Sequence, residues 1–147
     1  MNTIAIASDH AGFEYKPALV NHLKSRGYEV IDLGTNSDES VDYPVYAKKL
    51  CSEILSGKCE KGVLICGTGI GMSISANRFN GIRAALCPIP QYAKLAREHN
   101  NANVLCLGAR FTDLETCTRI LDVFLDTDFL GGRHENRVNQ IDIQKSV

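Results

Sequence analysis

The stretch CGTGIGMSISAN, residues 66–77, places one thiol directly before glycines at every second position, Gly67, Gly69 and Gly71. Glycines let a backbone approach a ligand closely, and the free N–H groups at the start of a following helix favour negative charge. A turn from strand to helix needs fewer glycines than three in alternation. The loop therefore predicts a cradle for an anion, with Cys66 at its rim.

Three familiar phosphate loops do not fit this stretch. The dinucleotide pattern G-x-G-x-x-G needs glycine at position 72, where Met72 stands. The nucleotide P-loop needs G-K-S/T, a triplet that the sequence does not contain. A cysteine phosphatase loop, C-x5-R-S/T from Cys66, needs arginine where Met72 stands. A phosphatase is disfavoured, and a non-catalytic nucleotide-binding module is the weaker alternative to an enzyme.

The Cys66 thiol is predicted to act as a base. Helix N-termini and nearby cations favour the thiolate form of cysteine, and a positioned thiolate can take a proton from a carbon next to a carbonyl. The enediolate formed in this way carries negative charge on oxygen, which the N–H groups of residues 67–71 would face. The alternative is that Cys66 is packed and inert, as cysteines often are.

Two arginines near the end of the chain fit a phosphorylated substrate. In GGRHENR, Arg133 and Arg137 are four residues apart, on one face if the segment is helical. Paired guanidinium groups bind a phosphate monoester through forked hydrogen bonds. A solvated surface helix explains the same pair equally well.

Other polar side chains have both a functional and a structural interpretation. His10 can bind phosphate or orient a sugar, whereas Asp9 beside it can simply cap the following helix. His99, followed by Asn100, can move a proton on a sugar ring oxygen or satisfy carbonyls at a helix end. Tyr43 can line the pocket or pack as an ordinary tyrosine.

Apolar runs alternate with amphipathic segments along the chain. Strands are expected over residues 3–8, 28–34, 62–66, 82–87 and 103–109. Helices are expected over 13–26, 44–56, 74–79, 91–99 and 113–126, with one more in the tail. Continuous apolar strands separated by helices predict an α/β fold, a three-layer α/β/α Rossmann-like domain with a five-stranded parallel sheet. We expect one domain over residues 1–147, whose tail from about residue 127 packs on a partner subunit.

Ligands of open parallel sheets bind at the carboxyl ends of the strands, where the strand order reverses. The first, third and fifth expected strands end next to an acid, an imidazole, a thiol, a hydroxyl and a guanidinium. These groups belong to Asp9, His10, Cys66, Thr68 and Arg110. We therefore expect the active site at this edge.

Composition excludes several other classes of protein. Sixteen Lys and Arg against seventeen Asp and Glu give a net charge of -1, which argues against nucleic-acid and membrane partners. The start of the chain lacks a secretion signal, and no apolar run reaches membrane-spanning length. The six cysteines form no C-x-x-C pair, and five of them are interpreted as inert reduced thiols. We expect a cytoplasmic protein without metal or cofactor.

Six blocks of the sequence closely resemble ribose-5-phosphate isomerase type B, a family that also includes isomerases of allose and galactose 6-phosphates. They are SDHAGF, DYP, ICGTGIGMSISANRF with the nearby GIRAA, REHNNANVL, LGAR and GGRHENRV. The likeness covers essentially the whole chain in the same order. It implies an aldose–ketose isomerase of the pentose phosphate pathway, which interconverts ribose 5-phosphate and ribulose 5-phosphate through a cis-enediolate without metal. A 6-phosphate of allose or galactose is the alternative substrate.

The resemblance also implies residue roles. Cys66 matches the family's base, and Thr68 and His99 match residues that assist ring opening. The enediolate-binding turn matches backbone groups of the stretch that contains Gly67, Gly69, Ile70 and Gly71, with Ser73 and Asn77 nearby. Positions that hold the sugar hydroxyls and the phosphate match Asp9, His10, Arg110, Arg133, His134 and Arg137.

A second branch of the family uses glutamate as base at the position of Met72 and has glycine in place of Cys66, so this sequence resembles the cysteine branch. Members form homodimers, often paired into tetramers, in which each site borrows residues from the neighbour. The resemblance therefore implies a homodimer or a dimer of dimers with shared active sites.

Overall fold

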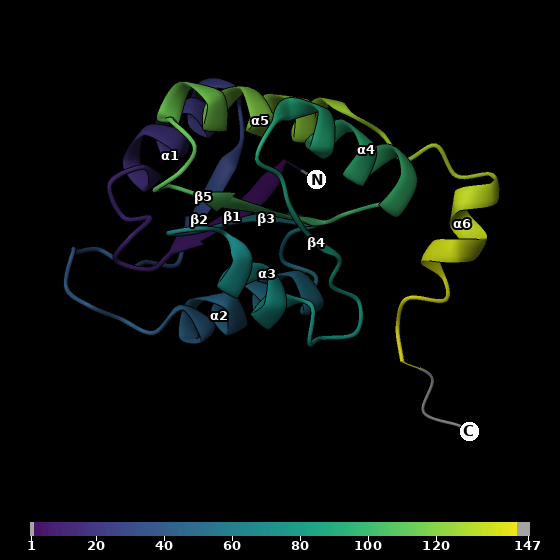
Figure 1. Cartoon of the computed structure of the whole chain (residues 1–147), viewed down its shortest axis with the longest axis horizontal. Helices are drawn as coiled ribbons and strands as arrows, with labels where there is room; N and C mark the ends of the chain where they lie inside the picture. Colours follow the sequence, from purple (N-terminus) through teal and green to yellow (C-terminus); the bar gives the residue numbers. More distant parts are fainter. Residues whose placement is uncertain (1, 144–147) are drawn as a thin grey trace.

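A computed structural model describes residues 2–143 and contains a five-stranded parallel sheet with helices on both faces (Figure 1). The strands are β1 (Thr3–Ser8), β2 (Glu29–Asp32), β3 (Lys61–Cys66), β4 (Ala84–Leu86) and β5 (Val104–Gly108). The helices are α1 (Lys16–Ser25), α2 (Tyr43–Leu55), α3 (Ile70–Ala76), α4 (Pro90–Asn100), α5 (Leu114–Asp126) and α6 (Arg133–Val138). The predicted fold class is confirmed, as is a helix in the tail.

Two apolar layers enclose the sheet. Helices α1, α4 and α5 cover one face, and α2 and α3 cover the other (Figure 1). Successive side chains of a strand point to opposite faces, so Ile4 and Ile6 join the first layer, whereas Ala5 and Ala7 join the second. Strands β1, β3 and β5 are buried on both faces, which explains why they read as continuous apolar runs.

Prolines, a side-chain cap and a glycine set several of the helix ends. Pro17, Pro44 and Pro90 lie in the first turns of α1, α2 and α4, where a missing N–H costs little. The Asp113 carboxylate caps α5 by accepting from the Thr116 N–H at 2.7 Å. Gly57, at φ +84°, follows the end of α2, as its position in the sequence predicts.

Four predicted elements have wrong bounds, and one of them is β2, which covers Glu29–Asp32 rather than 28–34. Helix α1 starts at Lys16 rather than 13, because the residues after β1 form a turn that the Asp9 carboxylate holds. Helix α3 runs from Ile70 to Ala76 rather than over 74–79, because Gly69 at φ +81° turns β3 directly into a helix. Strand β4 is shorter than expected, since this edge strand pairs with β5 over three residues only.

The strand order is β2-β1-β3-β5-β4. From β1 the chain passes to β2 on one side, and from β3 it passes to the other half of the sheet. The order therefore reverses between β1 and β3, and a crevice for a ligand forms at their carboxyl ends. Helix α6 lies apart from the body, beside the end of α4 (Figure 1). Among residues 2–143, no helix is long and apolar enough to span a bilayer.

Candidate active site

The carboxyl ends of β1, β3 and β5 lie side by side, about 4.8 Å apart. The Asp9 N–H donates to the Ile65 carbonyl at 3.1 Å, and the Ala109 N–H donates to the Cys66 carbonyl at 2.9 Å. The Arg110 N–H donates to the Gly67 carbonyl at 3.0 Å. Backbone pairing thus brings the loops that carry the acid, the imidazole, the thiol and the guanidinium to one edge of the sheet.

The Cys66 sulfur lies under the glycine loop rather than at an exposed rim, so that expectation is wrong. Residue 66 is 5% exposed, because strand alternation turns it, like Leu64, toward α2 and α3. The Gly69 N–H donates to its Sγ at 3.1 Å. A backbone donor aimed at sulfur stabilises negative charge there, as a base requires.

Three of the other cysteines have the opposite geometry. The thiols of Cys51, Cys87 and Cys117 donate to backbone carbonyls at 3.9, 3.6 and 3.8 Å. Burial raises the pKa of Cys51 to about 11, of Cys87 to about 12 and of Cys117 to about 11. Burial also raises the pKa of Cys59 and Cys106. All six cysteines are free, and these five are held as unreactive thiols.

Neighbouring side chains leave no space for a Cβ atom at two of the alternating glycines. At Gly69 a Cβ would lie 2.4 Å from the Leu86 side chain, and φ is +81°. At Gly71 a Cβ would lie 2.7 Å from the ring of Tyr43, which therefore packs directly on the loop. Helix α3 then begins without a side-chain cap. In the first turn of α3 the Ile70 N–H donates to Thr68 Oγ1, whereas no side chain among residues 2–143 accepts from the N–H groups of Gly71 and Met72.

Polar side chains around the loop are held in defined orientations. The exposed Thr68 Oγ1 accepts from the Ile70 N–H at 3.1 Å, which leaves its own proton free to donate. His10 Nδ1 accepts from the Val41 N–H at 3.1 Å, so the neutral ring carries its proton on Nε2. Asp9 Oδ1 accepts from the Ala11 and Gly12 N–H groups at 2.9 and 3.1 Å. Asp9 therefore holds the turn after β1 and does not cap α1, which starts at Lys16 without a side-chain cap.

Arg110 and Ser73 complete this edge in different ways. The exposed Arg110 side chain lies against Gly67, where a Cβ would be 3.2 Å from its guanidinium. Ser73 donates to the Ile70 carbonyl at 2.8 Å, within its own helix. We call the set at the carboxyl ends the carboxyl-edge group: Asp9, His10, Tyr43, Cys66, Gly67, Thr68, Gly69, Ile70, Gly71 and Arg110.

A second set of predicted site residues lies at the opposite edge. Helix α4 follows β4 and returns across the sheet, so its last residues lie near the amino ends of the strands. The Gly62 N–H, at the start of β3, donates to the Asn103 carbonyl just beyond α4, at 3.0 Å. Cys66 is at the other end of β3, about 13 Å from Gly62. His99 and Asn100 are therefore separated from Cys66 of the same chain.

Helix α6 adds three more residues to that edge. The rings of His99 and His134 stack with centroids 4.3 Å apart and an interplanar angle of 14°. In Figure 1 the β5 arrow points away from α6, which lies beyond the end of α4. Desolvation, and to a smaller extent the neighbouring His99, Arg133 and Arg137, lower the pKa of His134, which favours the neutral ring at pH 7. We call this set the amino-edge group: His99, Asn100, Arg133, His134 and Arg137.

Asn77 does not belong to the turn that carries Gly67 to Gly71. It follows α3, about 10 Å from that loop along the helix. Its amide donates to the Ala84 carbonyl at 2.9 Å, and its Oδ1 accepts from the Ala84 N–H at 2.8 Å. Asn77 thus pairs with the outer side of edge strand β4. Asn77, which the resemblance places near the enediolate turn, therefore lies beyond the far end of α3 in its own chain.

Replacing Asn77 with alanine should lower stability. The change leaves two backbone groups of Ala84 unpaired, and we expect a loss of about 1–3 kcal/mol in the free energy of unfolding. Urea denaturation would measure this loss. Asn21→Ala, an exposed change on α1, is the matched control and should have little effect. Equal stability of the two variants would contradict the pairing role.

Comparison with known proteins identifies the family of the chain. A sequence profile for Ribose/Galactose Isomerase matches residues 4–141. Ribose-5-phosphate isomerase B of Escherichia coli is 48% identical over 141 residues, which are 96% of this chain and 95% of that protein. The chain belongs to this family. The resemblance noted in the sequence is therefore confirmed.

Solved structures of the family agree with the fold. A ribose 5-phosphate isomerase from Thermotoga maritima has a TM-score of 0.93 at 58% identity, covering 95% of this chain and 97% of that one. Ribose-5-phosphate isomerase B from Mycoplasma genitalium, solved with bound ribulose-5-phosphate, has a TM-score of 0.91 at 42% identity. That alignment covers 95% of this chain and 93% of the other. The chain therefore has the architecture of the sugar-phosphate isomerases of this family.

Proposed function

We propose that the protein interconverts ribose 5-phosphate and ribulose 5-phosphate, with Cys66 as the base. Membership of the isomerase family and the names of the relatives support the reaction. One observation supports the base: the Gly69 N–H donates to the Cys66 sulfur inside a glycine loop at the reversal of strand order. The setting is the cytoplasm, within the pentose phosphate pathway.

The proton moves between neighbouring carbons. The Cys66 thiolate takes the proton from C2 of the open-chain aldose, and the electron pair flows into the C1 carbonyl to give a cis-enediolate. N–H groups of the loop from Gly67 to Gly71 stabilise the negative oxygen, apart from those of Gly69 and Ile70, which are already paired. The thiol then returns the proton to C1, the C2 oxygen becomes the carbonyl, and its proton passes to the C1 oxygen. No electron acceptor is needed.

The other groups bind the substrate and open its ring. The free proton of Thr68 and the ring of His99 serve the furanose oxygen, which must gain a proton as the ring opens. Arg133 and Arg137 bind the phosphate, and His10 donates from Nε2. His134, held neutral against His99, offers a donor without adding repulsion to the two arginines.

These roles require a second copy of the chain. Within one copy, the carboxyl-edge and amino-edge groups are at opposite ends of the strands, too far apart to contact one five-carbon substrate. A partner that places its amino-edge group over the carboxyl-edge group of the first copy completes the site. Twofold symmetry then builds two identical sites.

The surface supports such a partner. Ile70 and Ile74, 51% and 62% exposed, share one face of α3 beside the glycine loop. On the other side of edge strand β4, Tyr92 and Leu95 line a hollow of about 250 Å³. Large exposed apolar side chains along a strand edge are typical of an interface. The same surface contains Ile70, a member of the carboxyl-edge group.

A direct assay tests the reaction. Purified protein is incubated with ribose 5-phosphate, allose 6-phosphate and galactose 6-phosphate, with EDTA present, and ketose formation is measured. We expect the highest kcat/KM with ribose 5-phosphate and no effect of EDTA. Turnover of a hexose phosphate alone would replace the pentose as substrate. Absence of turnover with all three would overturn the proposal.

A further inference from the structure

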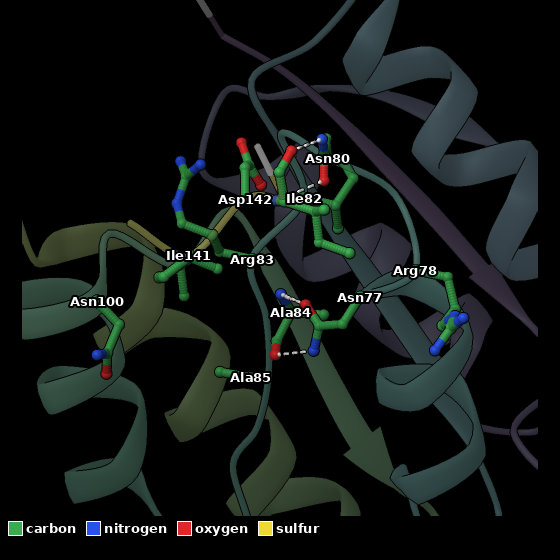
Figure 2. A pocket seen from close by; sticks show the side chains of 12 residues that line it. Asn77, Arg78, Asn80, Ile82, Arg83, Ala84, Ala85, Asn100, Ile141 and Asp142 are labelled. Atoms are coloured by element: carbon green, nitrogen blue, oxygen red, sulfur yellow. Dashed lines mark hydrogen bonds between the residues drawn. The ribbon is translucent and has the colours of Figure 1, made fainter. Parts of the chain in front are cut away.

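We propose that Asp142 and Asn80 are positioning residues, which fix α6 so that Arg133 and Arg137 are held ready for the phosphate. The expected effect on substrate binding rests on the proposed function, whereas the contacts that hold the tail do not depend on it. Figure 2 shows Asn80, Asp142 and Arg83 around a cavity of about 450 Å³ beside the start of β4. We call the contacts of Asn80 and Gly81 with residues 142 and 143 the tail clip.

The tail clip joins segments more than sixty residues apart. Both carboxylate oxygens of Asp142 accept from the Gly81 N–H at 3.1 Å. The Asn80 amide donates to the Ile143 carbonyl at 3.2 Å, and its Oδ1 accepts from the Ile143 N–H at 3.3 Å (Figure 2). The carboxylate makes its bond charge-assisted, and the amide imitates a strand pairing.

The segment around Gly81, to which the tail clip binds the tail, is itself fixed by hydrogen bonds and by packing. The Gly81 carbonyl accepts from Asn103 Nδ2 at 2.8 Å, and Asn103 Oδ1 accepts from the Arg83 N–H at 2.7 Å. Ile82, the next residue, is 2% exposed and belongs to the core on the α2 and α3 side. The clip therefore ties the tail to a fixed point of the body. Asp142 also adds to the field at Arg83, where it raises the guanidinium pKa against the larger lowering by burial.

Helix α6 needs contacts on both sides to hold its position. It has six residues, none of them buried, and a helix of this length is not stable alone. Gly131 and Gly132, at φ +66° and +56°, precede it and form a flexible entry. Before α6, the Leu130 N–H donates to the Glu98 carbonyl at 3.1 Å. The tail clip supplies the tether on the other side, so α6 is fastened at both ends.

Loosening the second tether should weaken phosphate binding and spare the chemistry. With one end free, α6 swings on Gly131 and Gly132, and its arginines occupy the binding arrangement for a smaller fraction of time. A smaller binding-competent fraction raises apparent dissociation constants in proportion. Phosphate is held alike in ground and transition states, so KM rises while kcat stays.

The test compares Asp142→Ala, Asp142→Asn and Asn80→Ala with the whole wild-type chain. For Asp142→Ala we expect KM for ribose 5-phosphate and the inhibition constant of inorganic phosphate to rise together by about tenfold. The kcat should stay within about twofold. Asp142→Asn keeps one acceptor oxygen and should show a smaller rise. Glu115→Ala, which removes an exposed carboxylate from α5, is the matched control and should leave all three constants unchanged.

Hydrogen exchange separates this inference from the proposed function. Asp142→Ala should speed amide exchange across residues 133–138 and leave the strands as protected as before. Unchanged exchange there, or faster exchange with unchanged KM and phosphate inhibition, would overturn the positioning role. A fall in kcat at constant KM would also overturn it. If the wild-type protein lacks isomerase activity, the proposed function fails. The positioning role of the tail clip can still be tested in that case, by hydrogen exchange across residues 133–138 and by calorimetric measurement of the affinity for inorganic phosphate.

Discussion

Cys66→Ser is expected to lower kcat by about 10²–10⁴-fold and to change KM little. Serine keeps nearly the same size and can still accept from the Gly69 N–H, so the loop should keep its shape. A hydroxyl, however, is a far weaker acid than a thiol and supplies almost no anion near neutral pH. The variant therefore removes the base and leaves the cradle. Steady-state kinetics with ribose 5-phosphate would measure both constants.

The control for this change is Cys59→Ser. Cys59 is 2% exposed and lies between α2 and β3, and burial raises the pKa of its thiol. Its loss should cost stability and leave kcat close to the wild-type value. A Cys66→Ser protein that kept near-normal turnover would remove Cys66 as the base. Equal losses of kcat in both variants would point to damage of the fold instead.

A mixture of two inactive variants is expected to regain activity. Cys66→Ser damages the carboxyl-edge group, and the double change Arg133→Ala with Arg137→Ala damages the amino-edge group. When a site takes one group from each copy, a hybrid dimer contains one site with both defects and one site with neither. Random assembly makes about half of the dimers hybrid, so about a quarter of the wild-type activity should return. Activity is measured at low substrate concentration after the two chains are unfolded and refolded together.

Two controls give this experiment its meaning. Each variant refolded alone should stay at its own low activity. Cys66→Ser refolded with Arg119→Ala, a change of an exposed arginine on α5, should give about half of the wild-type activity whether or not hybrids form, and so measures the yield of refolding. Recovery no greater than the average of the two parents would contradict a shared site. In that case both groups would have to meet within one chain.

Much of the fold could be predicted from the sequence because β1, β3 and β5 are buried on both faces. A strand of that kind must be apolar throughout, and these runs stand out against the amphipathic helices. The edge of the sheet that carries the site could be predicted from the same elements, since Asp9, Cys66 and Arg110 lie within two residues of strand ends. The proline and glycine signals at Pro44 and Gly57 placed α2 to within a residue.

What the sequence did not reveal depends on contacts between distant segments. The family resemblance places Asn77 near the glycine turn, yet one short helix separates it from that turn within its own chain. Cys66 comes directly before the glycine loop, whose sequence suggests an exposed rim, but strand alternation turns its sulfur inward. The tail clip has no local pattern at all, since Asn80 and Asp142 are ordinary surface residues until the tail folds back.

The most direct measurement is a crystal structure with a five-carbon phosphate hydroxamate, a stable mimic of the enediolate. The account predicts the Cys66 sulfur about 3–3.5 Å from the carbon atoms that exchange the proton. Amide groups from Gly67 to Gly71 should lie about 2.7–3.1 Å from the mimic's anionic oxygen. A sulfur that stays turned toward Met72 and Cys106, with a different side chain next to those carbons, would contradict it.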